Sequence, residues 1–160
     1  MSFRGLLGLA VLAAVIQPVS AGQPAAFVVG DKLASKLARQ MEISCKDGIG
    51  PGDGKRQSGW KQGLDLGKGD WAFVIDAGKL DCQYPSVCGT GGCDLAVVAV
   101  VSGKPRTVFE GRAIGWKLMQ PAGAATYLQL DRHGGECGKP GNAACLQNLD
   151  PATGKLAPAR

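Results

Sequence analysis

The segment Asp94-Leu-Ala-Val-Val-Ala-Val-Val101 decides the expected fold, because it is apolar at every position after Asp94. An almost continuous apolar run of this length is typical of a buried strand, so we expect both of its faces to be covered. The turn-forming residues Ser102-Gly103-Lys104-Pro105 follow it directly. Thr107–Glu110 is therefore predicted to return as the second strand of a hairpin.

Other short apolar segments surround this strand. Upstream, Trp71–Asp76 is predicted to be a strand, and three further strands are predicted downstream, at Ala113–Met119, Thr126–Leu130 and Cys145–Leu149. Pro151 and the polar tail after it are expected to fray.

The N-terminal side of the chain has the pattern of an amphipathic helix over Asp31–Glu42. Leu33, Leu37 and Met41 recur every four residues, and Asp31 is suited to cap the first turn. The cations on the opposite side form either a binding face or a solvated surface: Lys32, Lys36 and Arg39. After the helix, the polar and glycine-rich stretch Lys46–Lys68 is expected to be an irregular loop or a loose hairpin.

This order of elements predicts the fold class. A helix, a long loop and then a series of short strands indicate an α+β fold. We expect the N-terminal amphipathic helix to pack on a mostly antiparallel β-sheet, with disulfides that staple the domain.

The first 21 residues are organised like a secretory signal peptide. Arg4 precedes the apolar run Leu6–Ile16, and the small residues Val19-Ser20-Ala21 follow a polar break. The run is shorter than the roughly 20 residues that span a bilayer, so a short membrane anchor or a buried helix is the less favoured alternative. We expect cleavage after Ala21, a single domain over residues 22–160, and no transmembrane segment in the mature chain.

Six cysteines fall in the predicted mature region: Cys45, Cys82, Cys88, Cys93, Cys137 and Cys145. An even number in an exported chain predicts three disulfides. Zinc is disfavoured because the paired C-x2-C spacing is absent and the chain has one histidine. The turn-rich loop between Cys137 and Cys145 favours that pairing. For the other four cysteines we favour Cys88–Cys93 and Cys45–Cys82 among the alternatives.

Charge and motifs exclude several classes of ligand. The formal net charge is +5, but the basic residues are scattered, so we expect no nucleic-acid partner. Cys88-Gly-Thr-Gly-Gly-Cys93 lacks the Gly-Lys-Ser/Thr ending of a phosphate loop. It is interpreted as a disulfide-closed glycine turn, although its N–H groups could form an anion-binding nest. We expect no cofactor.

The segment Asp65-Leu-Gly-Lys-Gly-Asp70, with Asp76 after it, invites comparison with a calcium loop. Such loops place oxygen ligands at alternating positions around the cation. Here two of those positions are Gly67 and Gly69, which have no side-chain oxygen. We therefore prefer a tight turn and expect no tight calcium site at Asp65, Asp70 and Asp76.

His133 is the only candidate for catalytic acid–base chemistry that we identify, with Asp131 or Glu136 as its partner. A nucleophile is missing from the pattern, since the cysteines are expected to be paired and no serine lies in a Gly-x-Ser-x-Gly elbow. A hydroxyl or carboxylate within about 3 Å of the imidazole would favour an enzyme.

Several motifs occur together between Asp65 and Leu156. They are Phe73-Val-Ile-Asp76, Cys88–Cys93, His133-Gly-Gly-Glu-Cys137-Gly138 and Cys145. In these motifs the chain resembles a group of small, uncharacterised exported proteins of alphaproteobacteria. Gly67 departs from the asparagine in the group's Asp-x-Asn-x-Asp-Gly turn. The resemblance implies export and disulfides and implies no activity.

These observations predict an exported periplasmic or secreted binding or accessory protein. It would act through another periplasmic or envelope protein, for example as a subunit of a larger periplasmic complex. Two alternatives stay open, a small periplasmic hydrolase that uses His133 and an inhibitor of lytic enzymes. The basic charge disfavours the inhibitor, because lysozymes are usually basic and like charges slow encounter. A non-enzymatic role is favoured over a catalytic one.

Overall fold

The computed structural model describes residues 24–46, 55–82, 87–141 and 143–159. The predicted signal peptide, residues 1–21, lies outside them, and so does the part of the predicted loop over residues 47–54. Signal-peptide cleavage therefore stays a prediction. Within the described ranges, no helix combines the length and the apolar character needed to cross a bilayer.

One long helix, α1 (Ala25–Lys46), precedes all the strands. The strands of the first sheet are β1 (Lys61–Gly67), β2 (Asp70–Asp76), β3 (Cys88–Gly89), β4 (Gly92–Val101) and β5 (Lys104–Ala113). Those of the second sheet are β6 (Gly115–Met119), β7 (Tyr127–His133), β8 (Ala144–Leu149) and β9 (Leu156–Pro158). Two short 3₁₀ helices, η1 (Ala77–Lys79) and η2 (Gly134–Cys137), follow β2 and β7.

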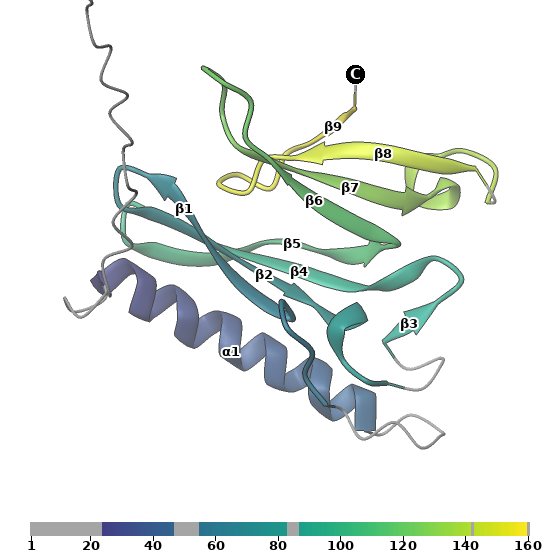
Figure 1. Cartoon of the computed structure of the whole chain (residues 1–160), viewed down its shortest axis with the longest axis horizontal. Helices are drawn as coiled ribbons and strands as arrows, with labels where there is room; N and C mark the ends of the chain where they lie inside the picture. Colours follow the sequence, from purple (N-terminus) through teal and green to yellow (C-terminus); the bar gives the residue numbers. More distant parts are fainter. Residues whose placement is uncertain (1–23, 47–54, 83–86, 142, 160) are drawn as a thin grey trace, which may run out of the picture.

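The elements are stacked in three layers (Figure 1), with α1 on one face of the first sheet and the second sheet on the other face. The first sheet has the order β1-β2-β4-β3, with β5 also paired to β4, and the second has the order β6-β7-β8-β9. Every pairing is antiparallel. The predicted α+β class, with a helix packed on antiparallel strands, is confirmed.

Strand β4 is covered on both faces, as its apolar run predicts. Val98 belongs to the cluster under α1, whereas Val97 packs with Leu128 of the second sheet. The helix lies close to the sheet at Gly30, where an added Cβ would lie 2.5 Å from Cε2 of Phe73. A single central strand thus supplies apolar side chains to two separate cores.

The helix is longer than the predicted Asp31–Glu42. It begins at Ala25, so Asp31 lies inside it and accepts a hydrogen bond from Lys61 Nζ at 2.8 Å. The expectation that Asp31 caps the helix is therefore wrong. Tertiary packing explains the earlier start, because the Phe27 ring lies edge-on to Trp71, with the ring centroids 4.9 Å apart.

Three strand predictions also need correction. Residues 61–67, expected to be loop or loose hairpin, form β1 and pair with β2, with a shift of register between Asp65 and Gly67. β5 is longer than the predicted Thr107–Glu110, because it pairs with almost the whole of β4. The tail does not fray after Pro151, which is fully buried, and β9 pairs with β8.

The structure contains the three favoured disulfides, which cross-link the fold at three places. Cys45–Cys82 ties the end of α1 to the chain after η1, and Cys88–Cys93 joins β3 to β4. Cys137–Cys145 joins η2 to β8. The Cys45–Cys82 bridge sits in a small core of its own, with Ala77, Leu80 and Val87.

Candidate functional site

His133 lies at the end of β7, on the outer face of the second sheet. Within the described chain, its imidazole makes no hydrogen bond or ion pair with a hydroxyl or carboxylate. Glu136 instead accepts a hydrogen bond from Arg132 Nη2 at 2.6 Å. Asp131 shares the outer face with His133 but is not bonded to it. Among the described residues, His133 therefore lacks the hydrogen bond to a hydroxyl or carboxylate that a hydrolase would need.

Arg132 is a buried cation that our sequence analysis missed. It is 6% exposed, and its Nη1 and Nε donate to Gln147 Oε1 at 2.9 Å and to the Arg112 carbonyl at 3.2 Å. Its guanidinium also lies 5.5 Å from the centroid of the Phe109 ring. The alternation with the buried Leu128 and Leu130 could have placed Arg132 on the inner face. These contacts connect β5 to β7, so its role is structural.

The three candidate calcium ligands are not brought together. Asp65 and Asp70 lie at the hairpin between β1 and β2, whereas Asp76 is at the far end of β2, about 20 Å away for six residues of strand. Asp65 Oδ1 accepts a hydrogen bond from the Gly67 N–H at 2.8 Å. Asp70 Oδ1 accepts one from the Ser102 N–H at 2.9 Å, which connects two neighbouring hairpin turns.

Asp76 also has a structural role, at a hollow of about 470 Å³ between β2 and β6. Its Oδ1 accepts a hydrogen bond from the Gly78 N–H at 2.9 Å, and its Oδ2 accepts one from Trp116 Nε1 at 3.0 Å. Both carboxylate oxygens are therefore engaged, one at the start of η1 and one across the two sheets. Across the described residues, no group of three or more His, Cys, Asp or Glu side chains could hold a metal ion.

A second hollow, of about 550 Å³, lies between α1 and the chain that leads into β1. We call it the basic cleft, and its lining residues are Lys32, Ser35, Lys36, Arg39, Glu42, Arg56, Trp60 and Lys61. Five of these eight side chains are cationic and one is acidic. The cleft therefore has a strong excess of positive charge.

Two of the five cations have fixed partners. Arg56 forms an ion pair with Glu42, in which Nη2 donates to Oε2 at 3.0 Å, and this hydrogen bond raises the pKa of the guanidinium. The same guanidinium lies 4.6 Å from the centroid of the Trp60 ring. Lys61 Nζ donates to Asp31 Oδ1 and to Ser35 Oγ, each at 2.8 Å. These contacts hold the wall of the cleft opposite the helix in place.

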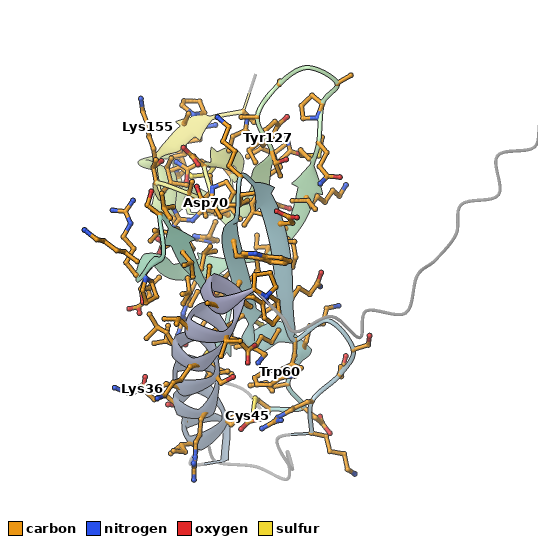
Figure 2. The ribbon with its side chains drawn as sticks, turned by 90° about the vertical axis from the view of Figure 1, so that its left-hand side faces the viewer. Lys36, Cys45, Trp60, Asp70, Tyr127 and Lys155 are labelled. Carbon is orange, nitrogen blue, oxygen red and sulfur yellow. A yellow bond between two sulfur atoms is a disulfide. The ribbon has the colours of Figure 1, made fainter. Side chains whose placement is uncertain are left out.

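The other three cations form the helix side of the cleft. Lys32, Lys36 and Arg39 are exposed and form no ion pair with any described carboxylate. Figure 2 shows Lys36 projecting outward from α1, so it extends the positive surface from the cleft onto the exposed ridge of the helix.

From the sequence, these three side chains could form either a binding face or a solvated surface. Arg56, Trp60 and Lys61 could not be assigned to the same site from the sequence, because they come from a stretch expected to be irregular. The fold brings both sets together into one charged hollow. The chain matches no family model, no curated protein and no solved structure.

Proposed function

We propose that the chain is an exported periplasmic or secreted binding protein, which acts by contact with another protein of the envelope. The observation that carries this proposal is the basic cleft, where Lys32, Lys36 and Arg39, which pair with no carboxylate of the described residues, border a hollow with fixed walls. An arrangement of this kind can recognise an anionic partner by charge complementarity and has no need of a nucleophile.

Export is supported by the leader-like residues 1–21, by the resemblance to exported alphaproteobacterial proteins and by the disulfides. It is tested by expressing the full chain in a bacterium and sequencing the N-terminus of the exported form. We expect this form to begin at Gly22. An exported protein that retains Leu6–Ile16 would contradict the proposal.

Binding is tested by cross-linking the mature protein to an envelope extract of its native host and identifying what is captured. We expect one specific protein, and we expect the His133→Ala variant to capture it equally well, because the imidazole has no described polar partner. A partner-independent hydrolytic activity that falls about a hundredfold in His133→Ala, with an unchanged melting temperature, would support the hydrolase alternative instead.

A further inference from the structure

We propose that the basic cleft binds an extended acidic segment of a partner protein, with the carboxylates paired to Lys32, Lys36 and Arg39. This inference rests on the proposed binding function and names the chemistry of its ligand. The charge of the cleft favours an anionic ligand, since five lining cations face one lining carboxylate, with Asp31 beside them. Among the described residues, the cations of the cleft without an ion-pair partner are the three on the helix side.

The spacing of these cations suits a chain with several charges. Lys32 and Lys36 are separated by a rise of about 6 Å along the helix, and Arg39 brings the total to about 10 Å. Side chains on one side of an extended peptide repeat about every 6.7 Å. Alternate acidic residues of an extended segment can therefore reach successive cations on the helix, which a single small anion cannot do.

A single phosphate group is a poorer fit. Phosphate sites commonly use the free N–H groups of a helix N-terminus. Here the helix side of the cleft is the middle of α1, whose N–H groups are already bonded within the helix. The positive charge comes from long side chains, two of them lysines, which act as point charges without the fork that matches phosphate.

A membrane surface is disfavoured because the apolar side of α1 already packs against the first sheet. The helix cannot insert that side into a bilayer without leaving the core. The exposed ridge does carry Val29 and Ile43, which are 43% and 53% exposed on either side of the cations. A protein segment can place apolar side chains against Val29 and Ile43 while its carboxylates pair with the cations.

The test measures binding of fluorescein-labelled hexaglutamate to the mature protein by fluorescence anisotropy. The cleft variant carries Lys32→Glu, Lys36→Glu and Arg39→Glu. The control variant carries Lys104→Glu, Lys139→Glu and Lys155→Glu, which reverse the same number of exposed cations on other elements. Near-ultraviolet circular dichroism verifies that each variant folds. If the cleft variant does not fold, the double variant Lys32→Ala, Arg39→Ala replaces it.

We expect hexaglutamate to bind at low salt and more weakly at about 0.15 M salt, where surface charges are screened. The affinity should fall about tenfold or more in the cleft variant, because three exposed ion pairs are lost together. The control variant should lose much less. Failure of the native protein to bind hexaglutamate at low salt, or an equal loss in the two variants, would overturn the inference.

Two further measurements separate this inference from the proposed function. Vesicles that contain phosphatidylglycerol should not bind through the cleft, and cleft-dependent binding to vesicles without binding to hexaglutamate would overturn the inference. If the cleft variant still captures the envelope partner as well as the native protein does, the inference fails and the binding function stands. Cleft-dependent hexaglutamate binding without any captured protein supports the ligand chemistry and contradicts the binding function.

Discussion

Removing the Cys45–Cys82 disulfide should destabilise the protein more than removing Cys88–Cys93. The first pair is separated by 37 residues and the second by 5. A cross-link restricts the unfolded chain more when its loop is longer, and the chain-entropy relation gives about 3.8 kcal/mol for the first and about 2 kcal/mol for the second at 25 °C. The stability of a domain is about 5–15 kcal/mol, so the larger loss is easily measured.

We compare the double variant Cys45→Ala, Cys82→Ala with the double variant Cys88→Ala, Cys93→Ala. Alanine is chosen because Cys45 is 2% exposed, and serine would bury a hydroxyl at that position. Urea unfolding followed by circular dichroism gives the free energy of unfolding and the m-value of each variant. If removing Cys88–Cys93 lowers the free energy of unfolding as much as removing Cys45–Cys82, or more, loop length does not control the stabilisation.

Three more predictions concern Gly30, Asp76 and the candidate calcium ligands. Gly30→Leu should lower the free energy of unfolding by about 1–3 kcal/mol in urea titrations, because overpacking against the sheet outweighs the higher helix propensity of leucine. The control Gln40→Leu, at an exposed helix position, should not lower it. Asp76→Ala should cost about 1–3 kcal/mol and change the fluorescence of Trp116, whereas Asp76→Asn, which keeps one acceptor, should cost less. Calcium at 1 mM should not raise the melting temperature, since a site filled a hundredfold over its dissociation constant would add about 2.7 kcal/mol. A rise of several degrees that Asp65→Ala abolishes would show a real calcium site.

Some of the structure could be predicted from residues that are close in the sequence. The apolar run of β4 indicates a strand covered on both faces, and the turn residues Ser102–Pro105 after it indicate a hairpin. The observed turn is shorter, because Lys104 and Pro105 already pair with β4. Ser102 and Gly103 are both left-handed, with φ of 52° and 74°, as a type I′ turn requires. The short, turn-rich loop before Cys145 likewise favours its bond to Cys137. These features depend on the local backbone preferences of neighbouring residues, which can be inferred from the sequence.

Other features depend on partners that are far away in the sequence. The earlier start of α1 depends on Phe27 packing against Trp71, and β9 depends on β8 as a pairing edge. Neither the start of the helix nor the order of the C-terminal tail follows from local preference, because burial against distant residues supplies the free energy.

The α+β class, the central strand and the Cys137–Cys145 bridge could therefore be predicted from apolar pattern, turn residues and cysteine spacing. The other two disulfides were favoured among alternatives, and the structure contains them. Only the tertiary structure decided that Asp65, Asp70 and Asp76 are separated structural groups. It also decided that the helix cations share one hollow with Arg56 and Lys61. The physical reason is that a site requires side chains from separate elements to converge, and that convergence is set by the packing of the helix on the sheet.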